Sequence, residues 1–320
     1  MPDMLTRRKV LLSKVEAVKG TDAAPVVASD LIVTMGDFVI AVPTEKDRGE
    51  GELKGTFGPG LGVVTKQSMS LEASARVRGL GQGVGALVTP MIHPLLMGSG
   101  HSVVTAGDGS ATPRSATYSP TSVAANLKSL TDYAYEDGLL YKMLGSVCNL
   151  SFEAAMAALT AKSTLQSKYT VPTVVGLPAF TLPAQKIFRM TSALCVVTKD
   201  AVAINIGAFN FDCGVKVEEA NETGQFFFEV SDRDPIVTID PKAVATAAEW
   251  DALTLATTLA LVATFTNELG ETLVFTAQKA ERDDVSSGNR AGRITRPLKL
   301  SLKEGAAGDD QYTIKWTGVL

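Results

Sequence analysis

The chain has 320 residues, 45% of them apolar and 20% charged, a composition typical of a globular protein with a sizeable buried core. Its 34 acidic and 30 basic residues give a formal net charge of −4, which argues against a protein that grips nucleic-acid phosphates through a strongly basic face. The three cysteines are widely spaced and suggest neither a disulfide framework nor a zinc site. The apolar runs are too short for a signal peptide or a membrane helix, so we expect a soluble protein made inside the cell.

The chain opens with a short basic and apolar segment, KVEAVKGTDAAP at residues 14–25. We treat residues 1 to about 25 as an N-terminal arm. Further along, GEGELKGTFGPGLG (49–62) has six glycines in fourteen residues and predicts a long loop. No convincing linker divides the chain, so the sequence predicts one elaborated domain over residues 1–320.

Most of the remaining sequence has the β-branched and aromatic content of strands, separated by Gly, Pro, Asn and Asp. We expect strands at Asp30–Val42, Val63–Val77, Leu139–Phe152, Ala193–Phe211, Phe226–Val230, Thr257–Thr266 and Glu271–Gln278, the last two as a hairpin that turns at Asn267–Glu271. Helices are few. The best candidate is DPKAVATAAEWDAL (240–253), with Asp240 as its cap and Pro241 in its first turn. A short helix is expected after Pro90, and the alanine-rich residues 151–165 favour helix by local propensity alone.

Two features of the sequence have residue types that occur in catalytic or nucleotide-binding sites. The only histidines, His93 and His101, lie beside Pro- and Gly-rich sequence without a nucleophile and base pattern, so we expect partly exposed structural side chains. GLGQGVGA (79–86) fits a dinucleotide-binding pattern, but Pro90 breaks the helix that a pyrophosphate would need. A bend between a strand and a short helix is the better interpretation.

The acidic cluster SDRDP (231–235) and the cysteines are also better explained structurally. Arg233 lies between Asp232 and Asp234 and would neutralise a cation site, so a charged turn that ends a strand is favoured. Cys195 and Cys213 have no histidine beside them in the sequence and are expected to be buried thiols. The sequence therefore predicts no enzyme, no cofactor and no metal, and favours a structural protein whose sheet edges are completed by other copies.

Four stretches resemble, in the same order, the major tail tube protein family of long-tailed bacteriophages. They are RRKVLLSKVEAVKGTDAAPVVASDLIV (7–33), LEASARVRGLGQGVGALVTPMIHPLLMGSG (71–100), YSPTSVAANLKSLTDYAYEDGLLYKMLGSVCNLSFEA (118–154) and FNFDCGVKVEEANETGQFFFEVSDRDPIVTIDP (209–241). The family features in them are a GTDAAP turn, a P…LL…G helix, a Y-x-P motif and a Y-x-DG hairpin turn. The glycine-rich stretch at 49–62 is expanded relative to the family pattern.

The resemblance implies a mainly β fold, a β-sandwich or barrel-like tail-tube subunit with one or two short flanking helices. It implies a hexameric ring, and stacked rings that form a hollow tube through which DNA passes without specific binding. Its partners would be further copies of itself and other tail proteins, such as the tape measure, the tail tip or baseplate, and the terminator. The protein would be assembled in the host bacterial cytoplasm and reside in the virion tail, away from membranes. The resemblance also favours strands over helix at residues 151–165.

The N-terminal arm and the glycine-rich loop are the expected contacts between subunits, the arm leaving its own subunit to lie on a neighbour. The candidate contact residues are Lys14, Val15, Glu16, Val18, Thr21, Asp22, Leu53, Phe57 and Leu61. Two other functions stay open. The chain could be another ring-forming β protein, such as a secretion-system tube or a virion decoration protein, or a nucleotide-binding module that uses the GLGQGVGA bend.

Overall fold

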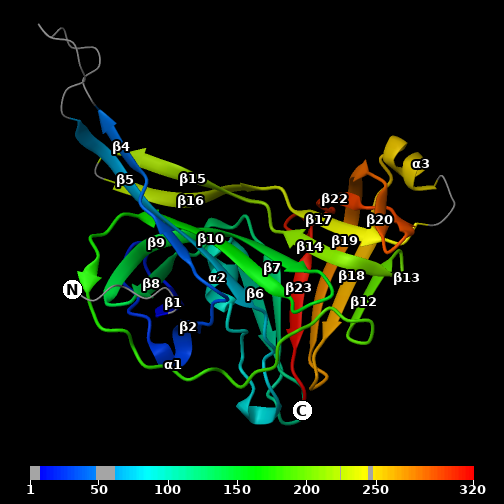
Figure 1. Ribbon diagram of the computed structural model, residues 1–320, viewed down its shortest axis with the longest axis horizontal. Coiled ribbons are helices and arrows are strands. Elements are labelled where there is room, and N and C mark those ends of the chain that lie inside the picture. The colour runs from blue at the N-terminus through cyan, green and yellow to red at the C-terminus, as the bar shows by residue number, and fades with distance from the viewer. Residues whose placement is uncertain (1–7, 48–61, 224, 244–247) are drawn as a thin grey trace, which may run out of the picture.

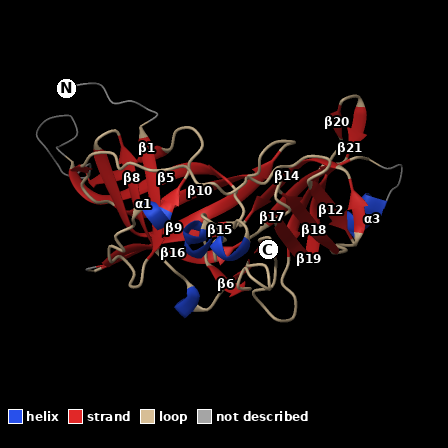
Figure 2. Cartoon of the chain, turned by 90° about the horizontal axis from the view of Figure 1, so that it is seen from below, coloured by secondary structure: helices blue, strands red, loops and turns tan. Residues whose placement is uncertain are grey.

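The computed structural model describes residues 8–47, 62–223, 225–243 and 248–320. The chain is mainly β, with a few short helices. Figure 2 shows strands along most of the chain. The helices are α1 (Val27–Asp30), α2 (His93–Gly98), α3 (Ala248–Thr254) and the 3-10 turns Gly83–Gly85 and Ala124–Asn126.

The longest described strand, β9 (Leu139–Ala154), pairs with different strands along its two halves. Its first half pairs with β8 (Leu130–Glu136), which pairs with β1 (Lys9–Val15) and through it with β2 (Leu31–Ile32). Its second half lies between two strands that lead in opposite directions. On one side β9 pairs with β10 (Thr160–Lys168) and β10 pairs with β5 (Val63–Arg76), which also pairs with β3 (Val39–Ala41) and β4 (Thr44–Asp47). On the other side the order is β14 (Ile206–Asp212), β17 (Ile236–Pro241), β22 (Leu298–Leu302) and β19 (Thr272–Val285).

The long strand β19 then begins a second run of strands. Its first residues pair with β18 on one edge and β23 on the other. The run is β13 (Val202–Ile204), β12 (Cys195–Lys199), β18 (Leu259–Thr266), β19, β23 (Thr313–Thr317), β7 (Ser115–Pro120) and β6 (His101–Ala106). The short strand β11 (Thr173–Val174) pairs with β9. Two hairpins form separate two-stranded sheets: β15 (Val215–Glu222) with β16 (Gln225–Arg233), and β20 (Gly288–Arg290) with β21 (Arg293–Thr295). The pairings do not close into a barrel within the described residues.

An aromatic core lies where the two runs of strands face each other. The ring of Phe275 on β19 lies 5.1 Å from that of Phe152 on β9 and 5.5 Å from that of Phe211 on β14, measured between centroids. Phe209 and Phe265 pack on the same ring at 5.3 and 5.9 Å. All five side chains are buried, and the tilted and edge-on ring contacts add to the hydrophobic term.

Most expected strands are confirmed. Val63–Val77 and Leu139–Phe152 correspond to β5 and β9, and the C-terminal hairpin is β18–β19, in which Thr266 pairs with Thr272. Residues 151–165 form the end of β9 and most of β10, as the resemblance implied and contrary to local helix propensity. Pairing with β5 and β14 outweighs the helix propensity of the alanines there. The short helix after Pro90 is α2, with Pro94 in its first turn.

Three predicted elements were wrong in extent. Asp30–Val42 forms only the short strands β2 and β3, and Ala193–Phe211 is broken into β12, β13 and β14. The helix predicted from Asp240 is instead α3, which begins at Ala248. Asp240 lies at the end of β17, where its carboxylate accepts bonds of 2.6 Å from the backbone N–H groups of Gly207 and Ala208. A strand contact therefore uses the side chain that was expected to cap a helix.

Candidate assembly surfaces

The N-terminal segment is part of the chain's own sheet. Lys14 and Val15 lie in β1, which is paired on both sides, with β8 and with β2. The prediction of an arm that leaves its own subunit therefore does not describe this conformation, because residues 9–15 are fixed by strand pairing. Contacts of these residues with a neighbouring copy stay a prediction.

Glu16 follows β1 directly and is buried, with 4% of its surface exposed. Its carboxylate accepts four hydrogen bonds. The backbone N–H groups of Gly20 and Gly145 donate at 2.7 and 2.8 Å, and the hydroxyls of Ser129 and Thr131 donate at 2.6 and 2.8 Å. A buried carboxylate is tolerated when its lone pairs are satisfied in this way. Glu16 therefore holds the segment after β1 against β8 and β9 of the same chain.

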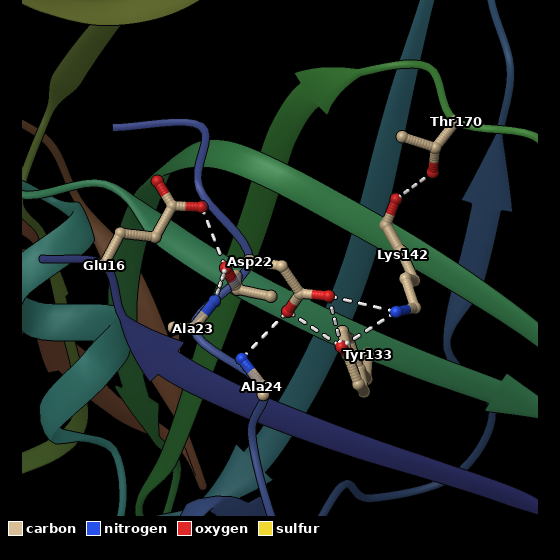
Figure 3. A network of polar contacts seen from close by, with 8 residues as sticks. Glu16, Asp22, Ala23, Ala24, Tyr133, Lys142 and Thr170 are labelled. Atoms are coloured by element: carbon tan, nitrogen blue, oxygen red, sulfur yellow. Dashed lines mark hydrogen bonds and ion pairs between the residues drawn. The ribbon is translucent and has the colours of Figure 1, made fainter. Parts of the chain in front are cut away.

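Asp22 forms a second anchor, shown with Glu16 in Figure 3. Its carboxylate accepts bonds from the Tyr133 hydroxyl at 2.6 Å, the Lys142 ammonium at 3.0 Å and the backbone N–H of Ala24 at 2.8 Å. Partial burial opposes ionisation, but these donors outweigh it and hold the pKa of the Asp22 carboxyl below its usual value. Between the two anchors, Val18 is 65% exposed and Thr21 is exposed. Val18, Thr21 and Asp22 are the exposed residues of the predicted contact set among the described residues, and Asp22 is bonded to its own chain.

The other predicted contact residues, Leu53, Phe57 and Leu61, lie outside the described residues. The structure shows instead what leads to them: a ribbon in which Thr44–Asp47 of β4 pairs with Val63–Gln67 of β5. Val63 and Val64 at its end are 70% and 48% exposed. Among the described residues, this part of β5 pairs only with β4, so one backbone edge of the ribbon stays open.

The hairpin β15–β16 is a second ribbon, which the sequence did not single out as an assembly surface. Its two strands pair with each other and with no other described strand, so both outer edges are open. One face of the hairpin packs on the body: Val215 and Phe228 are buried, and Val217 and Val230 lie against the main hydrophobic core. Lys19 also forms an ion pair with Glu229 at 2.8 Å, and Lys66 forms one with Glu219. Figure 1 shows the hairpin beside the β4–β5 ribbon, which extends beyond the other strands.

The same hairpin is acidic. Between residues 215 and 233 there are five carboxylates and two cations, which gives a formal charge of −3. The carboxylates are Glu218, Glu219, Glu222, Glu229 and Asp232, and the cations are Lys216 and Arg233. Four of the five carboxylates, all but Glu219, are on exposed residues.

The histidines differ from expectation in one respect. His93 is half-buried on α2, with Nδ1 2.8 Å from the Tyr118 hydroxyl, and burial lowers its pKa to about 4. His101 is fully buried, so the expectation of partial exposure was wrong for it. Its Nδ1 lies 2.9 Å from the Leu96 carbonyl and its Nε2 2.8 Å from the Tyr312 hydroxyl, and burial lowers its pKa to about 3. Both side chains hold structural hydrogen bonds.

The glycine-rich bend at 79–86 is occupied by contacts of its own chain. The backbone N–H of Gly81 donates to the Glu271 carboxylate at 2.6 Å, and that of Gly83 donates to the Val319 carbonyl at 2.8 Å. These are N–H groups that a phosphate would need. The bend between strand and short helix is confirmed, with a single 3-10 turn at its centre.

The remaining motifs have structural surroundings. Asp232 forms an ion pair with Lys216 at 2.6 Å, and β16 ends at Arg233, which confirms the charged turn. Cys213 is fully buried, as expected, and Cys195 is half-buried.

Among the described residues, no three or more metal-ligating side chains come together, and no helix is long and apolar enough to cross a membrane. No protein-family model matches the sequence, and no curated protein matches it either.

Proposed function

We propose that this protein is a non-catalytic structural subunit of a bacteriophage tail tube. Its copies form rings, hexameric in the family that the sequence resembles, and the rings stack into a conduit for DNA. In this proposal the two facing runs of strands are the subunit's β-sandwich, and the two ribbons pair with neighbouring copies.

The observation that carries the proposal is the open-edged hairpin β15–β16. The outer edges of this hairpin have unpaired N–H and C=O groups, which are a template for a further strand. Strand addition from a second copy would satisfy these groups, and a closed ring would leave no edge unpaired. The exposed valines at the end of the β4–β5 ribbon add apolar area beside it.

Charge supports the same function. A conduit for DNA must not bind phosphates, and the hairpin carries −3 of the chain's net −4. Carboxylates at a subunit junction repel a polyanion that passes nearby.

Excision of the hairpin tests this proposal. Val215 pairs with Arg233 at its base, and Arg233 donates to the Gly100 carbonyl at 2.5 Å. Replacing residues 216–232 with Asn-Gly keeps both ends and supplies a tight turn. The deletion also removes Val217, Phe228 and Val230 from their contacts with the body, so the variant should be less stable but keep a β-type circular dichroism spectrum. It should remain monomeric where the full chain forms rings or tubes.

The control replaces Ala291, in the two-residue turn of the hairpin β20–β21, with asparagine, which accepts the positive φ of this position. This hairpin is held to the body by the bridge between Thr295 and Lys242. The control should assemble like the full chain. A variant without residues 216–232 that still forms normal tubes contradicts the role given to the hairpin. If the full-length chain forms rings that never stack, the alternative of another ring-forming β protein is favoured.

A further inference from the structure

One outer face of the sheet carries almost no charge. β12, β18, β19, β23, β7 and β6 lie side by side (Figure 1), and their register aligns the outward residues in three rows. The rows are Thr198–Val262–Thr276–Thr313, Val196–Thr264–Val274–Lys315–Thr117–Val104 and Thr266–Thr272–Thr317–Ser115–Ala106. We call these fifteen residues the threonine face. Eight of them are threonines, and Lys315 is the one charged residue among them.

The threonine face is open to solvent. None of its residues is buried, whereas the residues that alternate with them, such as Leu261 and Phe265, are buried in the core. Its nine hydroxyls, from eight threonines and Ser115, make no hydrogen bond with the described residues, and none is a buried atom. Apart from Lys315, no side chain on it is longer than valine or threonine. The surface is therefore uniformly short, neutral and rich in hydroxyls.

The other outer face of the same fold is different. Two rows cross β5, β10, β9, β14, β17, β22 and β19: Arg76–Thr160–Glu153–Asn210–Thr238–Lys299–Asp284 and Ser74–Lys162–Ser151–Asp212–Ile236–Ser301–Glu281. We call these fourteen residues the charged face. Seven of them are charged: Arg76, Glu153, Lys299, Asp284, Lys162, Asp212 and Glu281.

The contrast between the faces needs a cause beyond strand propensity. Threonine and valine are good strand formers, but the charged face shows that strands of this protein also accept charges in outward positions. Surface charge normally keeps a protein soluble and prevents unwanted association. A solvent-facing sheet with one charge in fifteen residues is therefore suited to a particular neighbour.

We propose that the threonine face is the wall of the conduit, past which duplex DNA moves. This inference rests on the proposed tube function and adds to it the surface that the DNA meets. Attraction of DNA to a protein comes mainly from cations that replace its counterions, and the threonine face offers one per subunit. Apart from Lys315, its side chains are short and provide no projection that could enter a groove. Hydroxyls keep the wall wetted, so DNA passes over a hydrated surface without being held.

Gold labelling of assembled tubes tests the inference. Thr264, in the middle row, is replaced by cysteine in a Cys195→Ser background, because Cys148 and Cys213 are buried. Lys162→Cys in the same background is the matched control on the charged face. Tubes are polymerised from each full-length variant, reacted with a small maleimide–gold cluster, and viewed in cross-section by electron microscopy.

We expect gold on Thr264→Cys inside the tube and gold on Lys162→Cys away from the lumen. Gold from Thr264→Cys on the outer wall overturns the inference and leaves the tube function intact. The same holds if Thr264→Cys reacts as a free subunit but not in tubes, because the face is then buried between copies. A full-length chain that forms neither rings nor tubes overturns the proposed function, and this inference with it.

Discussion

Replacing Glu16 tests the finding that the N-terminal segment belongs to its own subunit. In Glu16→Ala, the Gly145 N–H and the Ser129 and Thr131 hydroxyls lose their acceptor, and all three donors are buried. A buried donor left unsatisfied costs about 1–3 kcal/mol. The Gly20 N–H lies at an exposed residue and can turn to water. We therefore expect Glu16→Ala to lower the free energy of unfolding by about 3 kcal/mol or more.

Glu16→Gln should cost much less. Its remaining oxygen can keep the bonds from Gly145 and Thr131, which share Oε1 in the native protein. Its NH₂ group then faces Ser129, whose hydroxyl can turn to accept, and the solvent-accessible Gly20. A loss of about 1 kcal/mol is expected.

The assay is urea-induced unfolding of the three proteins at low concentration, followed by tryptophan fluorescence and circular dichroism. Glu218→Ala is the control, because Glu218 is exposed on β15, and its effect should be within about 0.5 kcal/mol. A loss of less than about 1 kcal/mol in Glu16→Ala, or a Glu16→Gln protein as unstable as Glu16→Ala, would show that the buried donors do not depend on Glu16.

Three further predictions follow from other parts of the fold. Burial raises the pKa of the Asp132 carboxyl from 3.8 to about 6, so between these values the unfolded chain loses a proton that the folded chain keeps. Stability should therefore fall from about pH 4 to pH 6, less so in Asp132→Asn, as pH-dependent unfolding will show. Phe275→Ala removes the ring shared by four aromatic neighbours and should cost about 3–5 kcal/mol in the same unfolding assay, with Phe275→Leu losing less. Lys19→Ala removes the ion pair to Glu229 and a cation–π contact with Phe227 at 3.9 Å, so amide hydrogen exchange in β15–β16 should become faster while global stability changes by less than about 1 kcal/mol. Unchanged exchange in the hairpin would contradict a role of Lys19 in holding it.

The fold class and several strands were predictable because their signals are local. Alternation in LALVATFT corresponds to alternate burial along β18, and the turn after Thr266 leads directly into β19. Residues 151–165 show the limit of local signals. Their alanines favour helix, and only pairing with strands from other parts of the chain makes them β.

The candidate surfaces depend on residues far apart in the sequence. Glu16 reads as an exposed charge in an arm, yet its donors at Ser129, Thr131 and Gly145 are 113, 115 and 129 positions away. The threonine face has the same origin: each strand shows only alternating threonines and valines, and the neutral surface arises when the register aligns six strands. Neither feature can be read from a single segment.

In the proposed function, this chain assembles with itself through its open edges. Negative-stain electron microscopy of the purified full-length protein at low and high concentration, together with its mass in solution, tests it most directly. We predict six-fold rings or hollow tubes that become more abundant with concentration. A uniform monomer at every concentration, even after addition of preformed tail tips or baseplates, would contradict the account.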